Sequence, residues 1–352
     1  MAHQGNGLTR QAILRAPRVL DLVDVPTPAP GPGEVLVHIR AALTCGTDLK
    51  TYRRGHPRLP FGPFGHEAAG DVLSIGAGVV GYDPGQPVVF TPTAPCGSCD
   101  PCRRGRENLC TTLFHDMALG AYGDVLRLPA GVVRRHLFEK PSRLSYVEAA
   151  FLEPLACVIH AWRRLGPING GRVAIVGVGP IGLLHVLEAR RRGLEVIAVG
   201  RRSEALALAQ RAGARHIVNA AEVDVGEALR TLTGDGPEFI IECTGSVAVW
   251  QAAPSWAAAG GCVLLFGGLP GGSEPQFDAT RLHYGEVNLI SAFHYNTRDV
   301  RDALRLLGEG AVTPAVIITA ARPLDDIRQV FADLDRGAGI KYAIVPDGDP
   351  WH

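Results

Sequence analysis

The sequence carries no excess charge of either sign. Its 352 residues include 35 acidic and 35 basic side chains, so the formal net charge at pH 7 is zero. A chain without a basic excess offers no electrostatic footprint for nucleic acid or an anionic membrane. No apolar run reaches the ~18 residues that a membrane span needs, and Met1 to Arg10 lacks the apolar core of a secretory signal. We therefore expect a cytoplasmic protein that acts on a small molecule.

Internal repeats and low-complexity tracts are also missing, and the length favours two domains. Residues 11–140 are rich in Gly and Pro and alternate short apolar runs with turns, which predicts a mostly β domain. Further along, strands are expected at 173–177, 195–199, 216–219, 238–243, 261–266 and 287–293, with one helix between the first two strands that ends at Arg192 and another at 203–212. Repeated β-α units predict a parallel sheet covered on both faces. Residues 294–352, with a helix at 297–307, are expected to fold back on the first domain.

A helix start is marked where the composition changes. Ser145 and Glu148 form an S-x-x-E capping box, and Pro154 suits a first helical turn. Apolar residues then recur at helical spacing until Gly166, which is expected to end that helix.

Four of the eight cysteines crowd into fifteen residues: Cys96, Cys99, Cys102 and Cys110. In a reducing compartment such a cluster indicates a metal site, because one loop can wrap four thiolates around a tetrahedral ion. A four-iron cluster is the main alternative, since cysteines at this pitch also suit iron and sulfur. No Pro follows Cys110 and no second set is present, so structural zinc is favoured.

A dinucleotide fingerprint stands between an expected strand and an expected helix. The segment Gly177-Val-Gly-Pro-Ile-Gly182 fits G-x-G-x-x-G, whose glycines allow a tight turn and close approach of a pyrophosphate. The predicted binding residues are Gly177, Gly179, Pro180, Ile181 and Gly182.

The residues that follow the second strand favour NADP(H) over NAD(H). NAD sites place an acid there to bind the ribose hydroxyls, but this chain has Gly200 followed by Arg201, Arg202 and Ser203. Two guanidiniums at a helix start fit a 2′-phosphate. The alternative is that one or both arginines are solvated surface charge.

Three further segments offer ligands for a reactive metal: a thiol at Cys45, an imidazole at His66 beside Glu67, and a carboxylate at Glu153. Together with the preceding motifs they resemble the zinc-dependent medium-chain dehydrogenase/reductase (alcohol dehydrogenase) family over residues 11–347. The matching segments are Cys45-Gly-Thr-Asp-Leu, Gly65-His-Glu-Ala-Ala-Gly70, the four cysteines, Glu153-Pro-Leu and the glycine fingerprint. Glu153-Pro-Leu, Glu242-Cys-Thr-Gly and Phe293-His-Tyr-Asn resemble the sorbitol or polyol dehydrogenase branch.

The resemblance implies a GroES-like catalytic domain over 1–155, a Rossmann cofactor domain over 156–293 and a C-terminal return over 294–352. It also implies a homodimer or homotetramer. Cys45, His66 and Glu153 would bind the catalytic zinc, with Glu67 as an alternate or water-bridged ligand. Thr47 would hydrogen-bond the alcohol and pass its proton outward, and Thr244 would contact the cofactor.

Several positions depart from that pattern. Many relatives carry a His where this chain has Lys50, which alters the outer proton relay, and human-type sorbitol enzymes carry an Arg where this chain has His294. Cys157, one turn after Glu153, competes with it as a ligand. Candidate substrate-pocket residues are Tyr52, Phe114, His115, His294 and Tyr295, although core or surface roles are more common for such residues.

The predicted function is therefore a zinc-dependent dehydrogenase that transfers a hydride between NADP(H) and a secondary alcohol or ketone such as a polyol. The alternatives are an NAD(H)-using enzyme for an amino- or cyclitol alcohol, a zinc-free reductase of the same superfamily, and a non-catalytic relative that has kept the fold.

Overall fold

The computed structural model describes residues 7–168 and 170–346, which form two compact units. The first contains the described residues through Ala156, together with Tyr295–Gly310 and those from Ile318 onward. The second contains Cys157–His294 and Ala311–Ile317. The domain boundaries expected from the sequence stay a prediction. That prediction assigns all of residues 294–352 to the first domain and does not include the return of residues 311–317 to the second unit.

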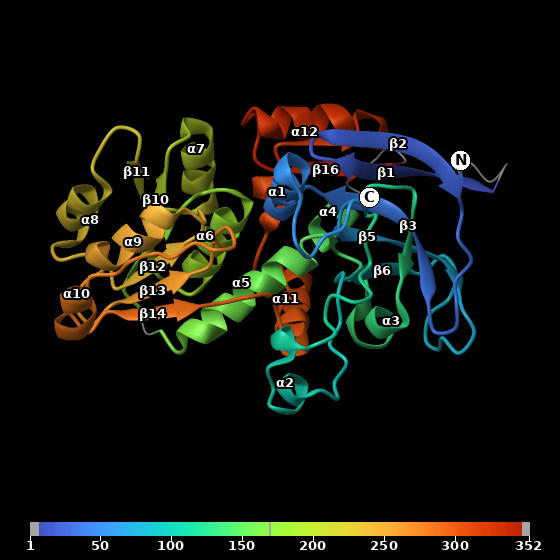
Figure 1. Ribbon diagram of the computed structural model, residues 1–352, viewed down its shortest axis with the longest axis horizontal. Coiled ribbons are helices and arrows are strands. Elements are labelled where there is room, and N and C mark those ends of the chain that lie inside the picture. The colour runs from blue at the N-terminus through green and yellow to red at the C-terminus, as the bar shows by residue number, and fades with distance from the viewer. Residues whose placement is uncertain (1–6, 169, 347–352) are drawn as a thin grey trace. The chain divides into compact units, whose positions relative to one another are not determined.

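The second unit is built on a six-stranded parallel sheet with strand order β11-β10-β9-β12-β13-β14 (Figure 1). This is the order of a Rossmann fold, in which ligands bind beyond the carboxyl ends of the two strands where the order reverses. Here those strands are β9 and β12. The strands are β9 (Arg172–Val176), β10 (Glu195–Gly200), β11 (His216–Asn219), β12 (Phe239–Glu242), β13 (Cys262–Leu265) and β14 (Asn288–Ser291).

Helices connect these strands and cover the sheet. In the contacts, α6 packs on α7 and on β9 and β10, whereas α8 packs on α9 and α9 on β12 and β13. Right-handed crossovers place these two pairs on opposite faces. The helices are α6 (Pro180–Arg191), α7 (Ser203–Ala212), α8 (Val225–Thr233), α9 (Val247–Trp256) and α10 (Ala279–Tyr284), with a short 3-10 turn η2 (Pro314–Ile317). The predicted parallel α/β architecture is confirmed.

The first unit is mainly antiparallel sheet. One sheet has the order β15-β16-β3-β5-β6-β8 with β7 beside β3, and the other has the order β2-β1-β4. The strands are β1 (Leu8–Ala16), β2 (Val19–Pro26), β3 (Val35–Leu43), β4 (Gly62–Pro63), β5 (Glu67–Ile75), β6 (Pro87–Phe90), β7 (Val125–Leu128), β8 (Leu137–Glu139), β15 (Ala320–Pro323) and β16 (Tyr342–Val345). The antiparallel pairing of β16 with β3 brings residues from the end of the chain into the first sheet.

Short helices interrupt this β framework. They are α1 (Gly46–Arg54), α2 (Asp100–Arg103), η1 (Glu107–Leu109), α3 (Ala130–His136), α4 (Tyr146–Ala149), α11 (Thr297–Gly308), η3 (Leu324–Asp326) and α12 (Ile327–Asp335). The capping box is present, but it starts only α4, and a separate helix α5 (Leu152–Leu165) follows with Pro154 in its first turn. Within the described residues, no helix has both the length and the apolar character to cross a membrane.

An aromatic cluster centred on Phe331 fixes α1 in the first unit. Phe331 lies on the buried face of α12, and its ring centroid is 5.4 Å from Tyr52, 5.1 Å from Phe64 and 5.6 Å from Tyr122. Such aromatic pairs bury large areas in defined geometries. Because Tyr52 belongs to α1 and Tyr122 contacts the residue before His66, this cluster also positions the candidate metal ligands.

Candidate metal centres and cofactor site

Cys45 stands at the N-cap of α1. Its φ and ψ of −117° and 150° are extended, and the backbone N–H of Thr47 donates to Cys45 Sγ over 3.3 Å. Thr51 Oγ1 in turn donates to the carbonyl of Thr47 over 2.8 Å. The helix start therefore directs an amide dipole at the sulfur, which favours the thiolate form that a metal requires.

His66 is oriented by an acid that the sequence did not reveal as functional. Asp48 Oδ1 lies 2.9 Å from His66 Nδ1, and Asp48 Oδ2 accepts a hydrogen bond of 2.6 Å from the Tyr122 hydroxyl. The Asp48 carboxylate lies beside this ring nitrogen, which leaves Nε2 as the candidate metal-binding atom. Gly65 is required for this packing, because it has φ +94° and a Cβ there would lie 2.7 Å from Tyr122 Cδ2.

Glu67 lies beside these ligands at the start of β5 and forms an ion pair in the interior. Lys341 Nζ is 2.5 Å from Glu67 Oε2 and also donates to the Thr44 carbonyl over 2.7 Å. Glu67 Oε1 is buried and has no hydrogen-bond partner among the described residues. One oxygen thus remains available for a further ligand.

Cys45, His66 and Glu67 form one group, with a ligand atom of each within 4.8 Å of the others. Burial raises the pKa of Cys45 and of Glu67. Burial alone would lower the pKa of His66, but the negative charges of Asp48 and Cys45 outweigh it and raise this pKa well above 6.5. A metal ion in this group would have to displace protons, as is usual for thiol and imidazole sites. The donor types and the unpartnered buried oxygen fit zinc.

Glu153 belongs to a different group of potential ligands. It lies in the first turn of α5, and one of its carboxylate oxygens is within 4.8 Å of Cys157 Sγ, one turn later. Cys157 Sγ is in turn within 4.8 Å of a His294 ring nitrogen. His294 has φ +60°, an uncommon conformation for a residue other than glycine. The third ligand of the reactive metal therefore stays a prediction.

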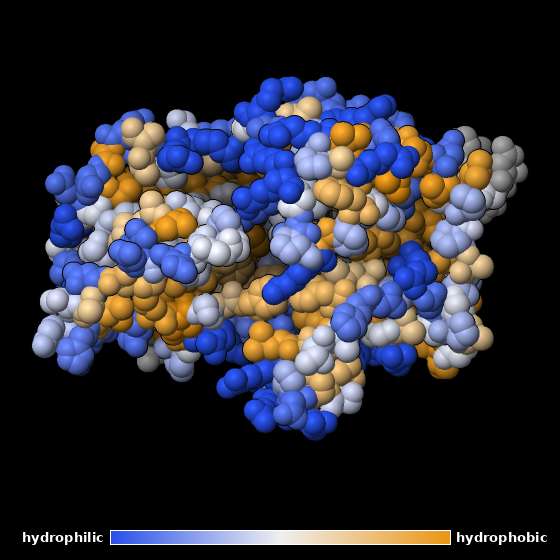
Figure 2. Space-filling view, in the orientation of Figure 1, coloured by the Kyte–Doolittle hydropathy of each residue, from blue (hydrophilic) through white to orange (hydrophobic). Residues whose placement is uncertain are grey.

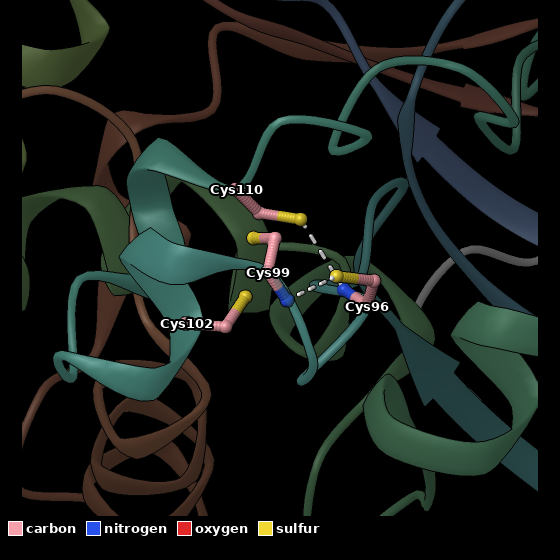
Figure 3. Close-up of side chains that lie close together, drawn as sticks. All are labelled: Cys96, Cys99, Cys102 and Cys110. Atoms are coloured by element: carbon pink, nitrogen blue, oxygen red, sulfur yellow. Dashed lines mark hydrogen bonds between the residues drawn. The ribbon is translucent and has the colours of Figure 1, made fainter.

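The four clustered cysteines converge at the loop that contains α2 and η1 (Figure 3). Their sulfur atoms all lie within 4.8 Å of one another, and none is in a disulfide. Cys96 Sγ accepts from Ser98 Oγ over 3.5 Å and from the backbone N–H groups of Ser98 and Cys99. These hydrogen bonds lower the pKa of Cys96 to about 5. Four convergent sulfurs with N–H donors fit a closed tetrahedral metal site.

Hydrogen bonds within the first unit attach this cysteine loop to the start of α11. Glu107 Oε2 accepts from the Thr297 N–H over 2.8 Å, and Asn296 Oδ1 accepts from the Asn108 N–H over 2.8 Å. Glu107 and Asn108 lie between Cys102 and Cys110. Ordering of the cysteine loop therefore also orders residues 296–297.

The cofactor candidates surround a cavity of about 530 Å³ in the second unit. Gly177 follows β9 with φ +96°, and a Cβ there would lie 2.7 Å from Thr244 Cγ2. Gly182 is equally constrained, because its Cβ would lie 2.0 Å from the Gly177 carbonyl. Of the predicted residues, the lining includes Gly177, Gly179, Gly200, Arg201, Arg202 and Thr244, whereas Pro180, Ile181 and Gly182 form the start of α6 and Ser203 that of α7.

Gly200 is required by the local packing, in addition to leaving this position without an acid. A Cβ at this position would lie 2.6 Å from Val178 Cγ2 and 3.2 Å from Leu206 Cδ2. A larger residue would force these side chains to move. Arg201 and Arg202 are exposed between β10 and α7, and Arg202 is the N-cap residue of that helix.

Glu242, a buried acid that sequence reasoning did not assign, orders the turn on the other side of the cavity. Its Oε1 accepts from the N–H groups of Thr244 and Gly245 over 2.6 and 3.0 Å, and its Oε2 accepts from Trp250 Nε1 over 2.9 Å. Burial raises the pKa of Glu242. The sequence signals were an acid at the end of a strand and the family-like segment Glu242-Cys-Thr-Gly, neither of which specified this role.

Two of the suggested pocket residues are core residues. Tyr52 packs against Phe331, and the buried Tyr295 hydroxyl lies 2.9 Å from Thr93 Oγ1. Phe114 is half-buried and His115 exposed.

Comparison with known proteins agrees with this geometry. Residues 180–309 match the family described as zinc-binding dehydrogenase, and residues 31–138 match the alcohol dehydrogenase GroES-like domain. Sorbitol dehydrogenase of Gallus gallus is 32% identical over 341 residues, which cover 93% of this chain and 94% of that protein. The chain belongs to the zinc-dependent medium-chain dehydrogenase family. Within it, the similarity lies with the sorbitol or polyol dehydrogenase branch.

Solved structures of this family share the fold. A zinc-binding dehydrogenase from Sinorhizobium meliloti 1021, bound to NADP, is 31% identical with a TM-score of 0.89 over 97% of this chain and all of that one. An alcohol dehydrogenase from Thermus sp. ATN1 is 27% identical with a TM-score of 0.86 over 96% of this chain and 99% of that one. This medium-chain dehydrogenase is thus an oxidoreductase that acts on CH–OH donors, with zinc and a nicotinamide cofactor.

Proposed function

We propose that the enzyme oxidises a secondary alcohol to a ketone with NADP⁺, releasing NADPH and a proton, and catalyses the reverse reduction. The observation that carries this proposal is the pairing of two features in one chain. Cys45, His66 and Glu67 converge in the first unit, and Arg201 and Arg202 line the nucleotide cavity of the second. A polyol or sugar-like alcohol is the substrate class that the sorbitol dehydrogenase relatives support.

Cys45, His66 and Glu153 would hold the catalytic zinc, with Glu67 as an alternate or water-bridged ligand. When bound, zinc would stabilise the alkoxide as a Lewis acid, and the nicotinamide would accept the hydride. The Asp48 carboxylate lies 2.9 Å from His66 Nδ1, so its negative charge faces that side of the ring. Lys341 neutralises one oxygen of Glu67, which limits the negative charge of the ligand group.

Thr47 is the group we assign to the alcohol proton. It lies two residues after Cys45, and its backbone is fixed by the bonds to Cys45 Sγ and from Thr51. Its hydroxyl can accept the alcohol proton while donating its own, so it carries a proton without forming an ion. The chain has Lys50 rather than His farther along α1, so the route beyond Thr47 differs from that of many relatives.

Arg201 and Arg202 support the preference for NADP(H). Both line the cavity directly after β10, where an NAD enzyme would place an acid. Arg201 has no carboxylate within ion-pair distance among the described residues, so its charge is not already neutralised. Charge-assisted bonds to a phosphate contribute roughly 1.5 to 3 kcal/mol each, less where water screens them. The NADP-bound relative from Sinorhizobium meliloti is consistent with this preference.

The test compares kcat/KM for NADP⁺ and NAD⁺ in the zinc-loaded enzyme with polyols, aminocyclitols, sugar alcohols and 2-alkanols. We expect NADP⁺ to be favoured on the order of a hundredfold, equivalent to about 3 kcal/mol. Replacing Arg201 and Arg202 together with Ala should remove most of that preference by raising the KM for NADP⁺.

Replacement of Gly200 by Asp is a poor test, because its Cβ would meet Val178 and the effect would mix packing with charge. Arg211→Ala in the last turn of α7 is a suitable control, since it removes a cation from the same helix away from the cavity. A preference of the unmodified enzyme for NAD⁺ would contradict the assignment of Arg201 and Arg202.

A further inference from the structure

Glu242 is a buried carboxylate at the end of β12, and the proposed reaction makes no use of it. Charged side chains generally lie at a protein surface, and hydrophilic residues cover the surface over α7 and α8 of the same unit (Figure 2). Glu242 is instead 0% exposed. No Lys, Arg or His in residues 7–168 or 170–346 lies within ion-pair distance of it. A buried charge without a counter-charge costs folding free energy, so a role beyond stability is expected.

Every described partner of the Glu242 carboxylate is a hydrogen-bond donor. Oε1 accepts from the backbone N–H groups of Thr244 and Gly245 over 2.6 and 3.0 Å, and also from the Thr244 hydroxyl. Oε2 accepts from Trp250 Nε1 over 2.9 Å. Burial raises the pKa of Glu242, but an arrangement of donors alone suits the charged form, which can only accept. Both oxygens therefore hold other parts of the chain in place.

These bonds join the turns that follow two neighbouring strands. Trp250 Nε1, on α9, donates to Glu242 Oε2 and also to the Gly267 carbonyl, over 2.9 Å in each case. The Gly267 N–H donates to the Glu242 carbonyl over 2.9 Å. The turns touch because both have glycine at the contact: a Cβ on Gly267 would lie 2.3 Å from the Gly245 nitrogen. Glu242 and Trp250 thus clamp the turn after β12 to the turn after β13.

The turn after β12 is part of the wall of the cofactor cavity. Thr244 and Ser246 line this cavity, as do Arg201 and Arg202. The Thr244 hydroxyl is committed to the turn itself, since it donates to Glu242 and accepts from the Ser246 N–H over 3.1 Å. In a Rossmann fold the residues after the second strand bind the ribose of the adenosine. The wall that Glu242 holds therefore belongs to the part of the cavity that would receive the adenosine end of a dinucleotide.

We propose that Glu242 is a positioning residue for the cofactor: its clamp with Trp250 fixes the wall against which the adenosine end binds. This role rests on the proposed function only in taking a nicotinamide dinucleotide as the ligand. The clamp would act on the part that NADP(H) and NAD(H) share, whereas Arg201 and Arg202 would act on the 2′-phosphate alone. Loss of the clamp should therefore weaken both cofactors by the same factor, whichever of them the enzyme prefers.

The experiment measures binding to the zinc-loaded full chain by titration calorimetry. The ligands are NADP⁺, NAD⁺ and adenosine 2′,5′-bisphosphate, which is the adenosine end of NADP⁺ alone. Glu242→Gln keeps the size of the side chain but turns one oxygen into an N–H₂ donor, which cannot accept from Trp250 or from the turn. We expect it to weaken all three ligands about tenfold, equivalent to about 1.4 kcal/mol. kcat at saturating cofactor and KM for the alcohol should stay close to those of the unmodified enzyme, because Cys45 and His66 belong to the first unit.

Trp250→Phe breaks the same clamp from its other side and keeps the carboxylate, so it decides the question even if Glu242→Gln folds poorly. It should weaken the three ligands to a similar extent. The double variant should bind no more weakly than the weaker single variant, because both changes break one clamp. Additive losses would show that Glu242 and Trp250 act independently and would overturn the proposal.

Glu188→Gln is the matched control. Glu188 is an equally buried acid of the second unit that pairs with Arg191 and Arg192 and does not line the cavity. Its replacement should lower Tm without changing the affinity for any of the three ligands. Equal weakening in this control would show that general destabilisation of the unit lowers affinity, and would overturn the positioning role.

Two further outcomes would also overturn the role of Glu242. One is an unchanged affinity in both clamp variants. The other is a loss confined to NADP⁺ and adenosine 2′,5′-bisphosphate, which would place the effect on the 2′-phosphate. Failure of the proposed function is separate: a preference of the unmodified enzyme for NAD⁺ would contradict the assignment of Arg201 and Arg202, while an equal loss of NAD⁺ and NADP⁺ binding in Glu242→Gln would still support the clamp.

Discussion

Lys341 Nζ lies 2.5 Å from Glu67 Oε2, and both side chains are only 1% exposed. Glu67 follows the candidate ligand His66, whereas Lys341 comes from the C-terminal part of the chain, just before β16. The lysine is further held by the Thr44 carbonyl and lies 5.4 Å from the centroid of the Phe151 ring. The C-terminal segment thus contributes the positive charge that allows a carboxylate to be buried beside the candidate metal ligands Cys45 and His66.

Lys341→Met should leave Glu67 as an uncompensated buried charge. Removing one partner of a buried ion pair typically costs about 3–5 kcal/mol, so a loss of this size is expected in the free energy of unfolding measured in denaturant. The double variant Lys341→Met with Glu67→Gln should recover part of it. Arg305→Met, which breaks the exposed pair with Glu309, is the control and should cost less than about 1 kcal/mol. Equal losses of unfolding free energy in Lys341→Met and Arg305→Met would show that the buried ion pair stabilises the fold no more than the exposed pair does.

If each chain binds a structural and a catalytic zinc, as we propose, Cys102→Ser should remove the structural one, measured by metal analysis. Structural zinc contributes folding free energy, so Tm should fall by roughly 5 °C or more, equivalent to about 2 kcal/mol. kcat/KM should stay close to that of the unmodified enzyme, because four cysteine ligands leave no open position at this zinc for a substrate. Cys262→Ser, a thiol outside the four-cysteine group, is the matched control. Unchanged Tm and oligomeric state after loss of the metal would argue against a structural role.

Glu153→Ala and Cys157→Ala together identify the third ligand of the catalytic zinc. We expect Glu153→Ala to lower zinc content toward one ion per chain and to abolish oxidation of alcohols, because three protein ligands are needed to hold a catalytic zinc. Cys157→Ala should retain both ions. Glu67→Gln, measured in parallel, tests its part as an alternate ligand. Loss of zinc in Cys157→Ala but not in Glu153→Ala would reverse the assignment.

His185 makes stability depend on pH. It is fully buried on α6 with its ring 4.9 Å from Phe266, and neither ring nitrogen has a hydrogen-bond partner among the described residues. Burial lowers its pKa to about 3. The unfolded chain gains a proton here below about pH 6.5 but the folded protein does not until about pH 3, so stability falls as pH drops through that window.

His185→Phe should therefore stabilise the protein more at pH 5 than at pH 8, by about 2 kcal/mol, which is 1.5 pH units at about 1.4 kcal/mol each. The measurement is denaturant unfolding at both pH values. The exposed His283→Gln is the control and should show no such difference. A gain that is the same at pH 5 and pH 8 would indicate packing alone.

Local patterns in the sequence were sufficient for much of the fold and for the identity of the motifs. The parallel sheet followed from apolar runs separated by helical segments, and the capping box at Ser145 is present, although it starts only α4. The helices α8, α9 and α10 were not predicted, and α1 and α3 interrupt a segment expected to be mostly β. The clustering of the four cysteines followed from spacing alone, because a short loop limits how far they can separate.

Tertiary structure decided the partners of the motif residues. Asp48 beside His66 and Lys341 on Glu67 are contacts that no spacing rule specifies. Lys341 reaches Glu67 only because β16 pairs with β3 at the other end of the chain. The sequence therefore determines which chemical groups are present and which are locally close. Burial and long-range strand pairing determine which charges meet, because a buried charge must find its counter-charge wherever the packed chain supplies it.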